Sequence, residues 1–136
     1  MLLFLEEKMI DHTGVTVSNF AKSKEFYSNA LSVIGYELLM ELPASVTGTT
    51  DVAGFDEPPK PDFWISKGES NKPPIHIAFR VDNRALVDAF YKAAIAAGGL
   101  DNGAPGVRPH YHPDYYGAFV LDPDGHNIEA VCHFSE

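Results

Sequence analysis

The chain repeats itself at a fixed offset of 64 residues, measured from His12 to His76. The matching pairs continue without a gap through a strand-like stretch and a helix-like stretch: Val17 with Val81, Asn19 with Asn83, Ala21 with Ala85, Phe26 with Phe90, Tyr27 with Tyr91 and Ala30 with Ala94. Self-similarity at a fixed period indicates that one supersecondary unit occurs twice. Because each copy carries a histidine at its start, we expect two imidazoles at pseudo-symmetric positions, facing a shared cavity.

The length of 136 residues is that of one ordinary domain. We therefore expect a single domain over residues 1–136, built of two modules at about 10–67 and 75–134, with residues 1–9 as an N-terminal arm. Hydrophobic periodicity predicts a strand and then a helix at the start of each module, with the first helix at about 20–31. Further strands are predicted at 33–42, 52–55, 62–66, 117–121 and 126–134. The fold class is α+β, with paired βαβββ modules.

Turn and cap residues support these boundaries. Ser18 or Asn19 is expected to cap the first helix, and Asp82 or Asn83 the second. Gly98-Gly99 provides a stop for the second helix. The stretch Asp122-Pro123-Asp124-Gly125 has proline at the second turn position and glycine at the fourth, which predicts a hairpin between the last two strands.

Composition excludes several classes of partner. The formal net charge is −9, which disfavours binding to nucleic acid and to anionic membrane surfaces. The N-terminal Leu2-Leu3-Phe4-Leu5 is too short for a membrane span and lacks the basic flank of a signal peptide. Cys132 is the only cysteine, so no internal disulfide can form. We expect a cytoplasmic protein that acts on a small molecule.

Strand alternation predicts which side chains share a face. In the first strand Val15 and Val17 lie on one face and His12 on the other; His76 is likewise opposite to Phe79. If the apolar faces pack under the helices, both histidines line the cavity. In the last strand Glu129 lies opposite to Ile128 and Ala130, so its carboxylate is expected to join the two imidazoles.

Two imidazoles and one carboxylate on separate strands form a set of metal ligands that leaves coordination positions open for water or substrate. The alternative is that histidines at strand starts are simply hydrogen-bonded. A carboxylate that points inward on an apolar strand must, however, be paired or ligated to stay charged. We therefore predict a divalent metal site formed by His12, His76 and Glu129. Nitrogen and oxygen ligands suit iron, manganese, cobalt, nickel and zinc alike.

Three sequence stretches resemble the vicinal oxygen chelate superfamily, which includes glyoxalase I, bleomycin resistance proteins, fosfomycin resistance enzymes and extradiol dioxygenases. The first runs over residues 11–17 and 23–27 (DHTGVTV and SKEFY), the second over 75–79 (IHIAF) and the third over 122–129 (DPDGHNIE). The third is the most specific. This resemblance implies paired βαβββ modules in an open, U-shaped mixed sheet around a metal, with ligands on the first and last strands of each module. His12, His76 and Glu129 match three of these positions.

The fourth position departs from the glyoxalase I pattern. At the repeat offset, Ile65 is the position in the first module that corresponds to Glu129, and no residue of Phe63-Trp64-Ile65 can ligate a metal. The resemblance implies that glyoxalase I uses carboxylates at the metal to move a proton, so this activity is disfavoured. Phe63 and Trp64 instead indicate an apolar wall of a substrate pocket, or else ordinary core aromatics.

Residues 108–116 form a second unusual stretch, rich in histidine, tyrosine and proline. It is either a solvated polar loop or part of the shell around a substrate. We name Arg108, His110, His112 and Tyr115 as candidate substrate-binding residues, and Tyr116 and Glu129 as candidate catalytic residues.

The sequence thus predicts a metal-dependent small-molecule enzyme, of lyase, dioxygenase or related type, with the metal acting as a Lewis acid on a chelating substrate. Two alternatives remain: a metal-free protein that sequesters its ligand, as bleomycin resistance proteins do, and a thiol transferase similar to fosfomycin resistance enzymes. The exposed sheet edges and helix faces of two small modules also predict a homodimer.

Overall fold

The computed structural model describes residues 9–136, so all but the last residue of the expected arm over residues 1–9 lies outside this range. The first module begins with strand β1 (Thr13–Val17) and helix α1 (Phe20–Ser32). Strand β2 (Glu37–Leu42), the short helix α2 (Ala44–Thr47), β3 (Val52–Asp56) and β4 (Phe63–Lys67) follow. Its strands form a mixed sheet in the order β1-β4-β3-β2, in which β1 and β4 are parallel.

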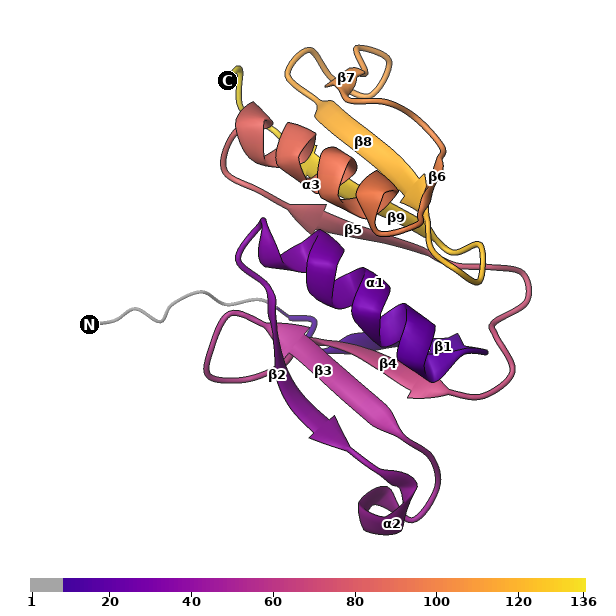
Figure 1. Cartoon of the computed structure of the whole chain (residues 1–136). Helices are drawn as coiled ribbons and strands as arrows, with labels where there is room; N and C mark the ends of the chain where they lie inside the picture. The colour runs from indigo at the N-terminus through magenta and orange to yellow at the C-terminus, as the bar shows by residue number, and fades with distance from the viewer. Residues whose placement is uncertain (1–8) are drawn as a thin grey trace.

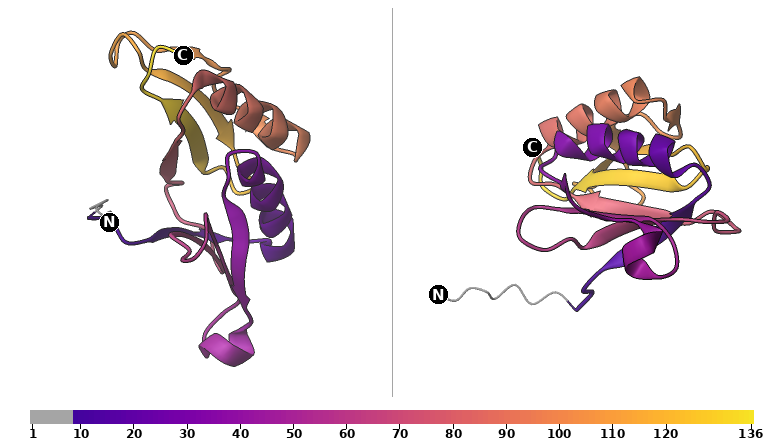
Figure 2. Two further views of the ribbon diagram at one scale, coloured as in Figure 1. Left: turned by 90° about the vertical axis from the view of Figure 1, so that its left-hand side faces the viewer. Right: turned by 60° about the horizontal axis from the view of Figure 1, so that its bottom comes forward.

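The second module repeats this plan. Strand β5 (His76–Arg80) leads into helix α3 (Arg84–Ala96), and the short strands β6 (Leu100–Asp101) and β7 (Gly106–Val107) precede β8 (Tyr116–Leu121) and β9 (Asn127–Cys132). The sheet order is β5-β9-β8-β6, with β7 also paired to β8. The predicted α+β fold with open mixed sheets is confirmed, although the strands form two separate sheets (Figures 1 and 2).

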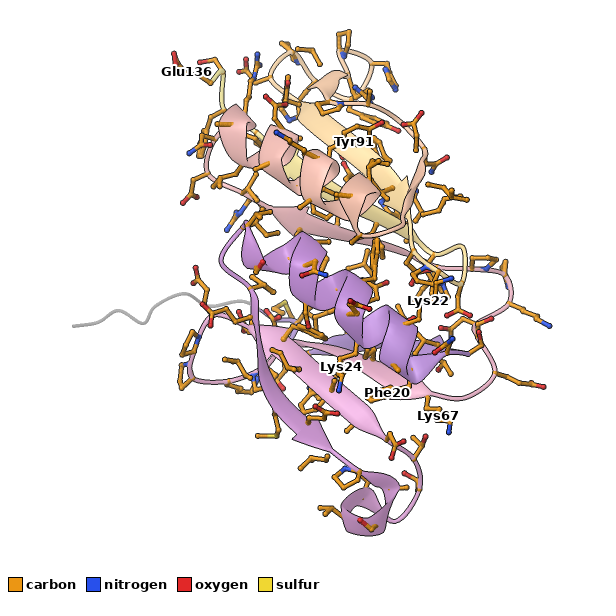
Figure 3. All side chains as sticks on the ribbon, in the orientation of Figure 1. Phe20, Lys22, Lys24, Lys67, Tyr91 and Glu136 are labelled. Atoms are coloured by element: carbon orange, nitrogen blue, oxygen red, sulfur yellow. The ribbon has the colours of Figure 1, made fainter. Side chains whose placement is uncertain are left out.

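Asparagine side chains start both long helices. The Asn19 side chain accepts a hydrogen bond from the Lys22 backbone N–H at 3.1 Å, and Asn83 accepts one from Leu86 at 2.9 Å. These contacts satisfy helix N–H groups that have no partner inside the helix. The two helices lie side by side in front of the sheets in Figure 1 and contact each other. Their outer faces carry polar side chains such as Lys22, Lys24 and Tyr91 (Figure 3).

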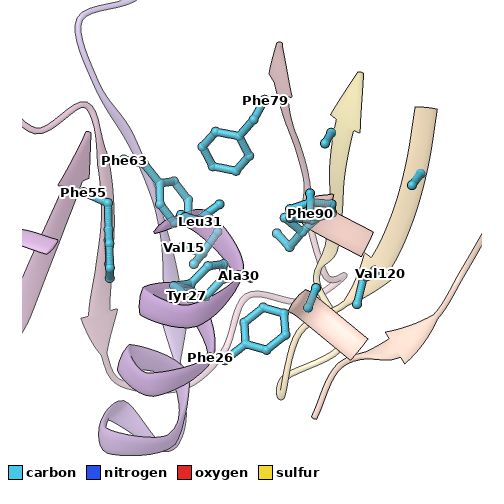
Figure 4. Packing of buried hydrophobic residues seen from close by; sticks show 14 of the residues in the cluster. Val15, Phe26, Tyr27, Ala30, Leu31, Phe55, Phe63, Phe79, Phe90 and Val120 are labelled. Atoms are coloured by element: carbon cyan, nitrogen blue, oxygen red, sulfur yellow. The ribbon is translucent and has the colours of Figure 1, made fainter. Parts of the chain in front are cut away.

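The core lies between the two helices and the two sheets. Figure 4 shows Phe26, Tyr27 and Leu31 of α1 among side chains from both modules. The Phe63 and Phe79 rings meet edge to face, with their centroids 5.3 Å apart, and so join β4 of one module to β5 of the other. Offset and edge-on ring contacts add to the free energy gained from apolar burial. One continuous apolar core therefore holds the two modules together.

The turn between β8 and β9 also joins the modules. Gly125 N–H donates to the Asp122 carbonyl at 2.9 Å, which confirms the predicted turn. The buried Asp122 carboxylate accepts from the Tyr27 hydroxyl on α1. The fully buried His126 ring accepts from Ile75 N–H at its Nδ1 atom and lies 3.1 Å from the Thr16 carbonyl at its Nε2 atom.

Strands begin and end within a few residues of the predicted bounds, with three additions. Helix α2 and the short strands β6 and β7 were not predicted. Strand β1 begins at Thr13, so His12 lies just before the ladder that β1 forms with β4. Within the described residues no helix has the length and apolar character needed to span a bilayer.

Candidate functional site

The pair formed by His76 and Glu129 lies on neighbouring parallel strands of the second sheet. His76 begins β5, Glu129 lies within β9, and His76 Nε2 donates to Glu129 Oε1 at 2.9 Å. The Glu129 side chain is 1% exposed, whereas that of His76 is 50% exposed. A carboxylate buried so completely requires charged or hydrogen-bonded partners to remain ionised. Access to this pair from solvent is therefore on the His76 side.

Tyr115 covers the other oxygen of the carboxylate. Its hydroxyl donates to Glu129 Oε2. Burial raises the pKa of Tyr115 well above the usual tyrosine range, and the hydrogen bond to Glu129 and the charge of Glu129 raise it further. The phenol therefore stays protonated at neutral pH and acts as a donor. Gly117 leaves room for this arrangement, because a Cβ atom there would lie 3.1 Å from Glu129 Oε2 and 3.3 Å from the Tyr115 ring.

The segment over residues 108–115, which we call the covering loop, holds Tyr115 in place. Arg108 N–H donates to the Tyr115 carbonyl at 2.7 Å, and Tyr115 N–H donates to the His112 carbonyl at 3.1 Å. His112 Nδ1 accepts from Asp114 N–H at 3.1 Å, which leaves Nε2 to donate to His133 Nδ1 at 2.9 Å. The covering loop is thereby tied to the residues that follow β9.

Arg108 lies next to the pair across one aromatic ring. Its guanidinium group is 5.4 Å from the centroid of Phe119, and the Phe119 ring is 6.1 Å from that of His76. The guanidinium also donates to the Gly106 and Ala104 carbonyls, each at 2.8 Å. Arg108 thus has a structural role in the preceding turn and brings a positive charge to the edge of the site. His110 is exposed, and its ring centroid lies 4.2 Å from that of Tyr111.

Tyr116, the predicted catalytic tyrosine, is not brought to Glu129. Its hydroxyl donates to Asp88 Oδ1 on α3 at 2.7 Å, and the Arg84 guanidinium lies 4.9 Å from its ring. The hydrogen bond to Asp88, followed by burial, raises the pKa of Tyr116. Successive side chains of a strand point to opposite faces, so Tyr116 points toward the helix while Tyr115 points toward Glu129.

His12 lies in the other module, with its own carboxylate partner. Its Nδ1 atom is 2.7 Å from Asp11 Oδ2, and Lys60 Nζ is 2.7 Å from Asp11 Oδ1. The hydrogen bonds from Lys60 and then from His12 lower the pKa of Asp11. An aspartate at Nδ1 orients the imidazole and leaves Nε2 free to bind a metal or to accept a proton. The His12 side chain is 61% exposed.

The two predicted pocket aromatics of the first sheet point in opposite directions. Phe63 is buried in the core against Tyr27 and Phe79, and it also borders a cleft between the modules. Trp64 is partly exposed and lines a hollow on the sheet face that carries His12. Gly14 pairs with Trp64 as Ala78 pairs with Glu129. The structural counterpart of Glu129 is therefore Trp64, one residue before the Ile65 that the repeat offset predicts.

Within the described part of the chain, no three histidine, cysteine, aspartate or glutamate side chains come close enough to hold one metal ion. The structure unites His76 and Glu129 but does not add His12. The donor atoms that it unites suit a metal, since two ligand bonds of about 2.1 Å at a right angle place their donors about 3 Å apart. The separation of 2.9 Å between His76 Nε2 and Glu129 Oε1 matches that spacing.

The site differs from the sequence-based prediction at two residues. Tyr116 was predicted to be catalytic, whereas Tyr115 contacts the Glu129 carboxylate. His133 was not among the predicted site residues, yet it hydrogen-bonds to His112. Strand alternation could have indicated both residues. Phe119 pairs with Glu129, and Tyr115 and His133 are each an even number of residues away from this pair along the chain, so they fall on the same face of the sheet.

Comparisons with known proteins agree with this fold. The sequence profile of the Glyoxalase/Bleomycin resistance protein/Dioxygenase superfamily matches residues 9–130. A glyoxalase/bleomycin resistance protein from Albidiferax ferrireducens T118 is 25% identical, with a TM-score of 0.72 over 92% of this chain and 98% of that one. A glyoxalase/bleomycin resistance protein/dioxygenase family enzyme from Burkholderia phytofirmans PsJN is 20% identical, with a TM-score of 0.66 over 92% and 98%.

A glyoxalase I mutant from Zea mays is 17% identical, with a TM-score of 0.66. The match covers 93% of this chain and 45% of the maize chain, so this protein spans about half of that length. At such identities the solved structures establish a shared fold. A comparison with curated proteins gave no match.

Proposed function

Because the chain belongs to the Glyoxalase/Bleomycin resistance protein/Dioxygenase superfamily, we propose that it is a divalent-metal-dependent enzyme acting on a small oxygen-bearing molecule. The observation that carries the proposal is the pair formed by His76 and Glu129. Nitrogen and oxygen donors lie 2.9 Å apart, and the carboxylate is fixed by a phenol on its far side. A partner that orients a ligating carboxylate in this way strengthens metal binding in other proteins.

We propose that His12 of a second copy of the chain supplies the third ligand. Two observations support this: His12 is exposed and oriented by Asp11, and no three-ligand group forms within residues 9–136. A homodimer that places the first sheet of one chain against the second sheet of another would unite the three residues. The predicted homodimer and the predicted ligands then depend on each other.

In such a site a divalent ion would supply Lewis-acid polarisation of a substrate oxygen. Glu129 would bind the ion through Oε1, while the Tyr115 hydroxyl keeps Oε2 hydrogen-bonded. Arg108 adds a fixed positive charge at the edge, which favours a substrate that is anionic or that develops negative charge. The chemistry of these groups fits lyase, dioxygenase or thiol-addition reactions.

Metal content tests the proposal directly. We expect protein purified without chelator to retain a divalent ion, and Glu129→Gln to lose it, because the amide is nearly isosteric but carries no charge. His110→Ala serves as the control, since His110 is exposed and its ring lies against Tyr111. Elemental analysis and circular dichroism check metal and fold together. Full metal retention by a folded Glu129→Gln protein would remove Glu129 from the site.

Mixing variants tests whether the site is shared between chains. His12→Ala and Glu129→Ala proteins should each bind no metal alone. After mixing, about half of the dimers contain one chain of each kind, and each mixed dimer has one intact site, so metal content should recover to about one quarter of the wild-type level. Recovery of nothing in proven mixed dimers would show that each site is built from one chain.

The absence of a three-ligand group within residues 9–136 also favours a second candidate function, metal-free sequestration of a ligand. In that case His76, Glu129 and Tyr115 form a polar hydrogen-bonded floor that recognises the ligand. Less than about a tenth of an equivalent of metal per chain, after reconstitution of the dimer at neutral pH, would favour sequestration over the enzyme.

Glyoxalase I activity should be weak. Trp64 occupies the position in the first sheet that corresponds to Glu129, so only one of the two equivalent positions carries a carboxylate. Proton transfer between two carbons benefits from more than one acid-base group. The assay is methylglyoxal with glutathione and metal-loaded protein. A kcat/KM in the ordinary enzymatic range of about 10⁴ to 10⁸ M⁻¹s⁻¹ would contradict this expectation.

A further inference from the structure

Two histidines meet where the covering loop reaches the residues that follow β9. His112 Nε2 lies 2.9 Å from His133 Nδ1, and the centroids of the two rings are 5.1 Å apart, so the rings touch at these nitrogen atoms. Such a contact is a hydrogen bond only if one nitrogen carries a proton and the other does not. The contact therefore depends on the protonation state of both imidazoles.

The backbone of the loop decides which nitrogen of His112 carries the proton. The Asp114 N–H lies 3.1 Å from His112 Nδ1, so this nitrogen accepts and bears no hydrogen. A neutral imidazole has one donor and one acceptor, which makes Nε2 of His112 the donor and Nδ1 of His133 the acceptor. Both hydrogen bonds are complete only when both imidazoles are neutral.

An added proton on either ring removes one of these two bonds. On His133 the proton occupies Nδ1, so two N–H groups would face each other at the contact. On His112 it occupies Nδ1 and would face the N–H of Asp114. When both rings are protonated, repulsion between two positive charges adds to these losses. Because histidine changes charge between about pH 5 and pH 8, mildly acidic solution acts against both bonds.

The immediate surroundings offer little compensation for positive charge on the two rings. Both imidazoles lie against the Tyr115 ring, whose centroid is 5.5 Å from that of His112 and 5.4 Å from that of His133. Within residues 9–136 neither imidazole has a carboxylate close enough for an ion pair, including those of Asp114 and Glu136. Protonation is therefore easier once the loop has moved away and water surrounds the rings.

Tyr115 transmits the state of the two histidines to the buried carboxylate. Its N–H donates to the His112 carbonyl at 3.1 Å, and its hydroxyl donates to Glu129 Oε2. Its carbonyl accepts from the Arg108 N–H, and its ring lies 4.7 Å from that of Tyr111. A displacement of His112 thus acts on the same residue that covers Glu129.

We propose that His112 and His133 form a proton-operated latch on the covering loop. With both imidazoles neutral, the latch is closed and holds Tyr115 on Glu129. With both protonated, the latch opens, Tyr115 leaves Glu129, and the buried carboxylate becomes accessible to water and ions. The effect of the latch on a reaction rests on the function proposed above, whereas the movement of the loop does not and is measured in metal-free protein.

The open loop binds up to two more protons than the closed loop, so linkage requires that acid favours the open state. Loss of one ordinary hydrogen bond changes an equilibrium about fivefold, and loss of two about twentyfold or more. From pH 7.5 to pH 5.5, in the presence of chelator, the Tyr115 and Arg108 amides should lose protection against hydrogen exchange by that larger factor, after correction for the intrinsic pH dependence of exchange. Amides between β8 and β9 should keep their protection.

Two asparagine variants separate the latch from other histidines. His133→Asn offers an amide oxygen in place of Nδ1, which still accepts from His112 but does not titrate. Over the same pH range its Tyr115 amide should lose only about fivefold in protection, from the bond to Asp114. His110→Asn removes an exposed histidine of the same loop and should behave as wild type. His76, which contacts Glu129, is present in both variants and cannot cause a difference between them.

The wild-type titration decides without any variant, since constant protection of Tyr115 from pH 7.5 to pH 5.5 would overturn the latch. A folded His133→Asn protein that loses protection as steeply as wild type would also overturn it, because His76 or Glu129 would then be responsible. Metal content at pH 7.5 is a separate measurement. Protein that binds no metal but shows the expected titration supports the latch and contradicts the proposed function, and metal-binding protein with constant protection does the opposite.

Discussion

At the scale of single residues, buried polar side chains join the two modules in addition to the apolar core. The His126 ring is fully buried. Its Nδ1 atom accepts from the N–H of Ile75, the residue before β5, and its Nε2 atom lies next to the Thr16 carbonyl on β1. One neutral tautomer satisfies both groups, with Nδ1 accepting and Nε2 donating. His126 belongs to the motif that resembles the family, yet its role in this chain is to connect the modules.

His126→Ala should therefore lower the free energy of unfolding by about 2 to 4 kcal/mol, because it leaves a backbone donor and acceptor without partners and opens a cavity. Urea denaturation measures the change. His110→Ala, an exposed histidine, should change stability by less than about 0.5 kcal/mol. A loss from His126→Ala as small as that control would show that water replaces the ring at no cost.

At the scale of elements, the covering loop explains why Glu129 is buried although its side chain lies on the face of β9 that is turned away from the helices. The aromatic side chains of the loop pack together, with the Tyr115 ring 5.5 Å from His112 and 5.4 Å from His133. His112 is held on both sides, by Asp114 N–H and by His133. The two imidazoles therefore decide how firmly Tyr115 is kept on Glu129.

His133→Ala should loosen the covering loop without unfolding the sheet beneath it. We expect amide hydrogen exchange of Tyr115 and Arg108, whose N–H groups bond within the loop, to accelerate about tenfold, while the amides between β8 and β9 keep their rates. Exchange measured by NMR on both sets provides an internal control. Unchanged rates at Tyr115 would mean that backbone bonds alone hold the loop.

At the scale of the whole molecule, Tyr27 and Tyr36 are two phenols with restricted access to water, and both belong to the first module. Burial, followed by the charge of Asp122, raises the pKa of Tyr27 well above 10.0. Burial, followed by the charge of Asp62, raises that of Tyr36. A group whose pKa is higher in the folded state contributes stability in full below its unfolded pKa, and loses it as the pH rises toward the folded value.

The protein should therefore lose stability above about pH 10, by up to about 1.4 kcal/mol per pH unit for each tyrosine that retains its proton in the folded state. Urea denaturation from pH 8 to pH 11 measures this slope. Tyr27→Phe should be less stable at pH 8, because Asp122 loses a donor, and should show a shallower alkaline decline. Parallel curves for both proteins would contradict the assignment to Tyr27.

The sequence by itself determined the repeated unit and which face of each strand a side chain occupies. The fixed offset of His12 and His76, the capping asparagines and the turn at Asp122 are local patterns, and alternation along a strand has a period of two residues whatever surrounds it. For that reason Glu129 could be placed on the face of His76, and the superfamily could be recognised from short motifs.

Tertiary structure alone decided how the faces meet. The pairing of β4 with β1 shifted the counterpart of Glu129 by one residue, from Ile65 to Trp64, because register depends on partner strands that local alternation does not specify. Packing of α1 beside α3 fixed the orientation of the modules, and it left His12 apart from the pair formed by His76 and Glu129. Contacts between residues far apart in the chain depend on such packing, which no local pattern encodes.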